Sequence, residues 1–221
     1  MLEPGVNCYV EDIRDYFREA KANEEYVTDK TGVKTLELIN ANFIADQPAI
    51  FGTVNQEYVQ RELDWYKSMS LNVNDIPGGA PQVWKQVAND HGEINCNYGW
   101  CIYSQENGKQ YDHVVKELRE NPNSRRAIMI YTRPHMWYDY NFLDMNDFMC
   151  TNTVQYFIRN SKLGVIVNMR SNDVVFGYKN DFAWQNYVAQ NVAKDLDVPL
   201  GTIIWNVASL HVYERHFDLI V

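Results

Sequence analysis

Long apolar segments are absent from this sequence of 221 residues. No run approaches the roughly 20 apolar residues that a membrane-spanning helix needs. The opening residues 1–5 also lack the basic and apolar regions of a signal peptide. These absences predict a soluble cytoplasmic protein that does not bind membranes.

Basic residues are also few. Lys and Arg number 20 against 29 Asp and Glu, which gives a formal net charge of -9 at pH 7. Direct binding of nucleic acid needs a basic surface that displaces counterions, so this balance argues against a nucleic-acid partner. A small anionic ligand held by a local group of arginines remains compatible with it.

Cysteines are scarce, and their spacing matches no zinc motif. The four are Cys8, Cys96, Cys101 and Cys150. Nothing in the sequence indicates the oxidising compartment in which disulfides persist. We therefore expect four free thiols, of which at most one is reactive, and no bound metal.

The sequence does contain enough apolar residues for a full core. They make up 46% of the chain, as in globular proteins, and no repeat, low-complexity tract or linker interrupts them. Residues 1–221 are therefore predicted to form a single domain.

Hydrophobic periodicity predicts a mixture of helices and strands. The expected helices cover residues 10–21, 55–69, 111–118 and 181–196. The expected strands cover residues 32–46, 126–132, 153–159, 163–169 and 202–213, and a loop rich in Pro and Gly covers residues 74–81. Because strands and helices do not alternate regularly, the pattern favours an α+β fold over a doubly wound sheet.

Two residues stand out as candidates for catalysis. Glu62 lies in the apolar stripe of the helix expected over residues 55–69, where burial would raise its pKa toward neutrality and let it move protons; pairing with a Lys or Arg at the stripe's edge is the alternative. Cys150 precedes an expected strand, a rigid support for a nucleophile. Nearby arginines would stabilise its thiolate, and a small buried side chain is the alternative.

Other polar residues indicate a binding site. Ser124 precedes Arg125 and Arg126, and Ser171 follows Arg170; guanidinium and hydroxyl donors together suit a phosphate, although solvated surface charge is the alternative. Asp181 opens an expected helix and would serve there as an N-cap. His211 and Tyr213 alternate on the last expected strand and share a face, where they would hold a sugar hydroxyl or pack together.

Several motifs occur in the order found in one enzyme family. They are Asp-Lys-Thr-Gly-Val-Lys-Thr (29–35), Gln-Arg-Glu-Leu-Asp-Trp (60–65), Asn-Tyr-Gly-Trp (97–100), Ser-Arg-Arg (124–126), Cys-Thr-Asn-Thr-Val-Gln (150–155), Asn-Met-Arg-Ser-Asn-Asp (168–173), Phe-Gly-Tyr-Lys-Asn-Asp-Phe (176–182) and Leu-His-Val-Tyr-Glu-Arg-His-Phe (210–217). From about Tyr26 to its end, the chain resembles the thymidylate synthase superfamily, most closely the deoxycytidylate hydroxymethylases of T-even phages. The resemblance implies a thymidylate synthase-like domain whose mixed, twisted β-sheet is flanked by helices and lies at a homodimer interface.

The resemblance also implies roles for individual residues. Cys150 falls on the nucleophile, Tyr98 lies close to it, and Glu62 falls on the carboxylate that organises proton transfer. The implied substrate contacts are Arg170 and Ser171 with the phosphate, Arg125 and Arg126 with the phosphate across the dimer interface, Lys30 where thymidylate synthases carry an Arg, and His211 and Tyr213 with the deoxyribose. Trp84, Asp173 and Glu62 fall beside the folate.

The implied reaction uses 5,10-methylenetetrahydrofolate as co-substrate and dCMP as substrate. A thiolate that adds to C6 of the pyrimidine makes C5 able to attack a one-carbon electrophile. Water capture then leaves a hydroxymethyl group on C5. If a phage encodes the protein, its compartment is the host cytoplasm.

Asp181 stands where thymidylate synthases have Asn. An Asn amide donates to O4 of uracil and accepts from N3–H, whereas cytosine offers a 4-amino donor and an N3 acceptor. A carboxyl group accepts from the amino group and, when protonated, donates to N3. Asp181 is therefore predicted to select dCMP, and Thr151, in place of a family His, fits the same branch.

Other functions stay open from the sequence alone. They are a dCMP C5-methylase, a dUMP-specific thymidylate synthase, and an inactive nucleotide-binding paralogue or fragment. Because family members continue beyond the motif at residues 210–217, a truncated C-terminus is expected at Val221.

Overall fold

The computed structural model describes residues 5–30 and 32–221. Residues 1–4, part of the opening segment that argued against a signal peptide, and Thr31 in the motif at 29–35 lie outside the described residues. The chain divides into two compact units. The first, called here the sheet unit, comprises residues up to 54 and from 156 onward, and the second, the helical unit, comprises residues 55–155.

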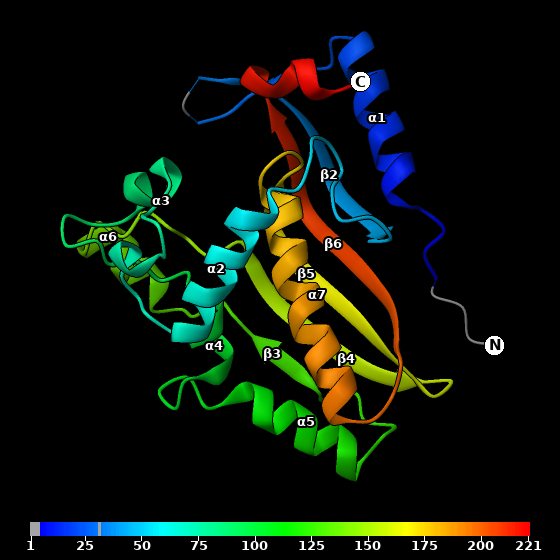
Figure 1. The fold of residues 1–221 in the computed structure, drawn as a ribbon. Helices are drawn as coiled ribbons and strands as arrows, with labels where there is room; N and C mark the ends of the chain where they lie inside the picture. Colours follow the sequence, from blue (N-terminus) through cyan, green and yellow to red (C-terminus); the bar gives the residue numbers. More distant parts are fainter. Residues whose placement is uncertain (1–4, 31) are drawn as a thin grey trace. The chain divides into compact units, whose positions relative to one another are not determined.

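The sheet unit is built on a mixed sheet (Figure 1). Its strands are β1 (Val27–Thr28), β2 (Lys34–Ile44), β5 (Lys162–Asp173) and β6 (Leu200–Tyr213), in the spatial order β1-β2-β6-β5. β2 runs antiparallel to β1 and β6, whereas β5 and β6 are parallel. The mixed sheet expected from the sequence is thus confirmed.

Two longer helices cover this sheet. α1 (Val10–Ala22) packs beside β2 and buries Val10, Ile13 and Phe17, which recur at helical spacing. α7 (Gly177–Asp195) packs on β5 and β6, as Figure 1 shows. A 3₁₀ helix, η2 (Glu214–Leu219), follows β6.

The start of α7 differs from the expected one. The Asp173 Oδ1 atom accepts from the backbone N–H groups of Val175, Phe176 and Gly177 at 2.9, 2.5 and 3.4 Å. Asp173 therefore satisfies the N–H groups that a helix start leaves unpaired, and α7 begins four residues earlier than predicted. Asp181 lies inside the helix, so the interpretation of Asp181 as an N-cap is wrong.

The helical unit carries the remaining elements. They are α2 (Gln56–Ser68), η1 (Val73–Asp75), α3 (Gln82–Val87), α4 (Tyr98–Tyr103), α5 (Gln110–Glu120), β3 (Ile128–Ile130) and α6 (Met136–Phe142), with β4 (Thr151–Arg159) beginning in it. β3 pairs antiparallel with β4, Met129 opposite Val154. No helix in the described part of the chain is both long and apolar enough to cross a membrane.

α2 and α4 pack unusually closely. A Cβ built on Gly99 would lie 1.8 Å from the backbone oxygen of Tyr66, so only glycine fits there. The Asn97 side chain caps α4 through the Trp100 N–H at 2.8 Å and donates to the backbone oxygen of Trp65 at 3.0 Å. These contacts fix α4 against the helix that carries Glu62.

Candidate active site

Glu62 lies on the buried face of α2 and is 5% exposed. Its Oε1 atom accepts from the Tyr58 hydroxyl at 2.6 Å and from the Trp84 indole Nε1 at 3.2 Å. The Trp84 Nε1 atom also lies 3.0 Å from the Tyr58 hydroxyl oxygen. Among the described residues, no Lys or Arg pairs with Glu62, so the alternative of an ion pair at the stripe's edge is wrong.

The surroundings of Glu62 set its protonation. Burial raises the pKa of Glu62, and the hydrogen bonds from Tyr58 and Trp84 oppose that shift because they stabilise the charged form. Burial and the neighbouring Glu62 charge raise the pKa of Tyr58 as well. A carboxyl group with a raised pKa and two fixed donors is suited to release and recover a proton.

Cys150 is half-buried and directly precedes β4. The next residue, Thr151, is fully buried, and its hydroxyl bonds to the Tyr98 hydroxyl at 3.1 Å. Tyr98 in turn stacks on Tyr66, with ring centroids 5.3 Å apart. The segment after Cys150 is thereby tied to α4 and α2, so the thiol sits on a rigid support.

The other three thiols have raised pKa values and are less suited to nucleophilic chemistry. Burial, followed by the Asp147 charge, raises the pKa of Cys96 well above its ordinary value. Burial raises the pKa of Cys101 to about 12, against a smaller opposing effect of Arg133. Burial also raises the pKa of Cys8, which lies in the sheet unit.

Asp147 braces the loop that leads to Cys150. It is 6% exposed, and its Oδ2 atom accepts from the backbone N–H groups of Asn95 and Cys96 at 2.5 and 2.6 Å. Burial raises the pKa of Asp147 to about 6, although these hydrogen bonds act in the opposite direction. The loop is therefore joined to the start of the α4 segment through a carboxyl group that titrates near neutrality.

Replacing Asp147 with Asn should flatten the acid-side pH dependence of stability. The folded-state pKa of Asp147 is raised from 3.8 to about 6, so the folded protein binds the proton more tightly and loses stability as pH rises from about 4 to about 7. Two pKa units correspond to about 3 kcal/mol. Asn keeps an acceptor oxygen but carries no charge. As pH rises from about 4 to about 7, the unfolding free energy of Asp147→Asn should therefore increase by about 3 kcal/mol relative to that of the native protein.

Urea unfolding at several pH values measures this difference. The exposed Asp90→Asn variant is the matched control, because its side chain is already in water. A constant difference between native protein and Asp147→Asn across the range would show that Asp147 does not titrate in the folded state.

The sheet unit holds the second group of predicted residues. Asp173 at the end of β5 lies opposite His211 on β6, and Ser171 lies opposite Ser209. The rings of His211 and Tyr213 are 5.1 Å apart and nearly perpendicular, as expected for residues that share a strand face. Arg170, next to Ser171 on β5, is exposed.

Asp173 has one carboxylate oxygen left over. Its Oδ1 atom caps α7, whereas its Oδ2 atom is buried and has no hydrogen-bond partner in the described part of the chain. A buried acceptor without a partner is costly. It therefore fits a ligand that brings an N–H donor to it, as the pterin ring of a folate does.

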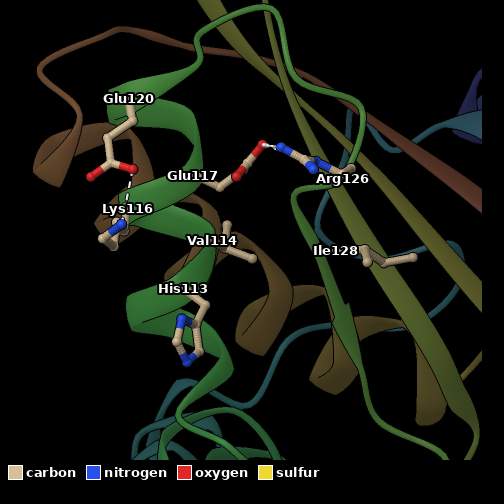
Figure 2. Close-up of a pocket in the computed structure, with 7 residues that line it drawn as sticks. All are labelled: His113, Val114, Lys116, Glu117, Glu120, Arg126 and Ile128. Carbon is tan, nitrogen blue, oxygen red and sulfur yellow. Dashed lines mark hydrogen bonds and ion pairs between the residues drawn. The ribbon is translucent and has the colours of Figure 1, made fainter.

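The remaining predicted cations lie on the surface. Lys30 is exposed in the turn between β1 and β2. In the helical unit Arg125 is exposed, and Arg126 pairs with Glu117 at 3.1 Å. Figure 2 shows this pair among the residues of α5, β3 and the segment between them that line a cavity of about 330 Å³. None of the candidate catalytic residues lines this cavity.

The whole chain is similar to proteins of one enzyme family. The family model for thymidylate synthase matches residues 9–221. The chain is 58% identical over 218 residues to the deoxycytidylate 5-hydroxymethyltransferase of Enterobacteria phage T4, covering 96% of this chain and 89% of that protein. The chain belongs to the thymidylate synthase family.

More distant members of the thymidylate synthase family agree. Thymidylate synthase from Francisella philomiragia is 25% identical over 219 residues, covering 92% of this chain and 80% of that protein. The structure of thermostable thymidylate synthase A from Bacillus subtilis superposes with a TM-score of 0.68 at 23% identity, covering 93% of this chain and 81% of that one. The thymidylate synthase-like fold is thus confirmed.

Sequence reasoning missed three residues of this thymidylate synthase family member. Tyr58 was assigned no role, although its spacing of four residues from Glu62 places the two on one helix face. Asp147 was not singled out, and Asn172 lies in the motif at 168–173 but was assigned no role. Asn172 donates to Asp181 at 2.8 Å, a contact between β5 and α7 that no local pattern indicates.

Proposed function

We propose that this protein transfers the one-carbon unit of 5,10-methylenetetrahydrofolate to C5 of dCMP and yields 5-hydroxymethyl-dCMP. The observation that carries the proposal is the 58% identity, over nearly the whole chain, to the phage T4 deoxycytidylate 5-hydroxymethyltransferase. The half-buried Cys150, the buried Glu62 and the carboxylate at position 181 supply the chemistry that this reaction needs.

Cys150 acts as the nucleophile in this proposal. Its thiolate forms a bond to C6 of cytosine, and the electron pair of the C5–C6 double bond becomes available at C5. C5 attacks the one-carbon unit that the folate carries. Removal of the C5 proton and cleavage of the bond between that carbon and the folate nitrogen release tetrahydrofolate and leave an exocyclic methylene at C5, to which water adds to give the hydroxymethyl group. Elimination at the end of the cycle breaks the Cys150–C6 bond, which restores the thiolate.

Glu62 manages the protons of the cycle. The Tyr58 hydroxyl and the Trp84 indole hold its carboxylate oxygen in one position. Burial raises the pKa of Glu62, which makes its carboxylate a better proton acceptor than an exposed one. It would thus serve removal of the C5 proton and activation of the water that supplies the hydroxyl oxygen.

Residues of the sheet unit bind the two substrates. Arg170 and Ser171 contact the phosphate, and His211 and Tyr213 contact the deoxyribose. Asp181 reads the base. The Asp173 Oδ2 atom, which has no partner among the described residues, accepts an N–H group of the folate. In the helical unit, Trp84 is the aromatic residue proposed for folate binding.

Product analysis tests the proposal directly. The protein is incubated with dCMP or dUMP and methylenetetrahydrofolate in ¹⁸O-labelled water, and the nucleotide is examined by mass spectrometry. We expect dCMP to gain one carbon, two hydrogens and one labelled oxygen. Gain of a methyl group, or reaction of dUMP alone, would contradict the proposal and support a methylase or a thymidylate synthase.

We further propose a homodimer in which Arg125 and Arg126 complete the phosphate site of the partner. Among the described residues the Arg126 guanidinium pairs with Glu117 at the surface, and such pairs contribute little to stability. The arginine is therefore able to exchange Glu117 for a phosphate at small cost.

Subunit mixing tests the shared site. Arg126→Ala and Cys150→Ala homodimers should each be nearly inactive, whereas a mixed dimer contains one site with both native residues. After random exchange, half of the dimers are mixed, so about a quarter of native activity should return. Mixed dimers, verified by two affinity tags, that remain inactive would show that each chain builds its own phosphate site.

A further inference from the structure

Asp181 receives a hydrogen bond from a side chain without an assigned role. The Asn172 Nδ2 atom donates to Asp181 Oδ2 at 2.8 Å, and the Asn172 Oδ1 atom accepts from the Trp205 Nε1 atom at 3.2 Å. Asn172 is 3% exposed and Trp205 is fully buried. The chain Trp205–Asn172–Asp181 therefore links β6, β5 and α7 inside the sheet unit.

The chemistry of this chain fixes the orientation of the Asn172 amide. An indole N–H only donates, so the Asn172 oxygen must face Trp205. The opposite orientation would bring two donors together at Trp205 and two acceptors together at Asp181. Asn172 thus always presents N–H to Asp181.

The packing leaves room for this contact through a glycine. A Cβ built on Gly177 would lie 2.9 Å from the Asn172 Nδ2 atom and 3.8 Å from the Asp181 Oδ2 atom. Any side chain at position 177 would thus press on the donor. The first turn of α7 is shaped to admit the bond.

A hydrogen bond donated to a carboxylate favours its charged form. A carboxylate has two accepting oxygens, and cytosine protonated at N3 offers two donors, N3–H and the 4-amino group. Uracil offers the N3–H donor and the O4 acceptor, so it pairs well only with a neutral carboxyl group. A residue that keeps Asp181 ionised therefore favours cytosine.

We propose that Asn172, oriented by Trp205, is a positioning residue that makes Asp181 specific for cytosine. It holds Asp181 as a carboxylate, and the proton shared between Asp181 and the base rests on N3. The inference builds on the proposed function, because it assumes that Asp181 faces the base.

The Asp181→Asn variant also tests the contact between residues 172 and 181, because an amide at position 181 has one donor end and one acceptor end. In Asp181→Asn the amide oxygen must accept from Asn172, so the amide presents one donor and acceptor order to the base. Thymidylate synthases, which this chain resembles, read uracil with an Asn at this position, so we expect this variant to prefer dUMP. Without Asn172 the amide would turn either way and read both bases.

The test is a double-mutant cycle with kcat/KM measured for dCMP and dUMP. The four proteins are the native chain, Asn172→Ala, Asp181→Asn and the double variant. We expect Asn172→Ala to lower the dCMP:dUMP ratio of the native chain about tenfold or more, the effect of one lost hydrogen bond to a charged group. In the Asp181→Asn protein, adding Asn172→Ala should raise the dCMP:dUMP ratio of kcat/KM by a similar factor.

Shifts of the dCMP:dUMP ratio in opposite directions in the two backgrounds indicate a positioning role. A structural defect would instead lower kcat/KM for dCMP and dUMP by the same factor. Asn168→Ala is the matched control, because Asn168 accepts from the Asn206 amide at 3.0 Å between the same two strands; its ratio should stay unchanged. If Asn172→Ala fails to fold, Trp205→Phe replaces it in the test. Trp205→Phe removes the indole N–H that orients Asn172, so it should change the dCMP:dUMP ratio in the same way.

If Asn172→Ala lowers kcat/KM for dCMP and dUMP equally, in both the native and the Asp181→Asn protein, the proposal for Asn172 is overturned. Equilibrium binding of dCMP and dUMP to the same proteins separates this outcome from failure of the proposed function. If the native protein does not turn over dCMP, the function is wrong, while the binding ratios still decide the role of Asn172.

Discussion

Cys150→Ser should lower kcat with dCMP by roughly 10⁴-fold or more, because a serine hydroxyl at neutral pH is a far weaker nucleophile than a thiolate. Binding of dCMP should change little, since it rests on phosphate, sugar and base contacts. The half-exposed Cys150 differs from the buried Cys96 and Cys101, whose pKa values burial raises.

A substrate that cannot release its C5 substituent makes the covalent bond visible. With 5-fluoro-dCMP and methylenetetrahydrofolate, loss of a proton from C5 is blocked, so the adduct should accumulate. Mass spectrometry of the digested protein should find nucleotide and folate on the peptide that contains Cys150. Serine at this position should leave the peptide unmodified.

The Cys8→Ser variant is the control for the loss of a thiol. Cys8 is half-buried like Cys150, but it lies in the sheet unit and has no proposed role. Its turnover and adduct formation should match those of the native protein. Native turnover by Cys150→Ser would rule out the covalent mechanism.

Glu62→Gln should lower kcat by roughly 10²- to 10⁴-fold, the range expected when a general acid–base group is removed. The Gln side chain keeps an oxygen that accepts from Tyr58 and Trp84, so the local geometry is preserved while the proton-carrying function is lost. The KM for dCMP should stay within a few-fold of the native value.

Tyr58→Phe is the matched variant for the environment of Glu62. It removes the hydroxyl that donates to Glu62 at 2.6 Å but keeps the ring. That hydrogen bond lowers the pKa of Glu62, so its loss should raise the pKa further and shift the pH–kcat profile to higher pH. An unshifted profile, or a Glu62→Gln variant with native kcat, would show that Glu62 does not transfer protons.

The sequence by itself determined much of the local structure around the candidate site. The helical stripe of α2 placed Glu62 on its buried face, because period-3.6 spacing is a local property. Alternation on the last strand placed His211 and Tyr213 on one face. The ordered motifs indicated the family, which the comparisons confirm.

Short helices escaped the sequence because their stability is not local. α3 and α4 have 6 residues each, and α6 has 7. So few residues cannot display helical periodicity, and isolated helices of this length are unstable in water. α4 forms because Gly99 admits close contact with Tyr66 and because Asn97 bonds to both α2 and its own first turn.

Only the tertiary structure decided the partners of the polar side chains. The sequence offered Asp181 as a cap, but Asp173 caps α7 and Asp181 accepts from Asn172 instead. Asn172 lies on β5, and its orientation depends on Trp205 of β6, 33 residues away. Pairing between strands and helices distant in sequence sets these contacts, and periodicity within a segment carries no information about them. The candidate site residues could thus be named from the sequence, whereas their hydrogen-bond partners and orientation follow from neighbours that folding brings to them.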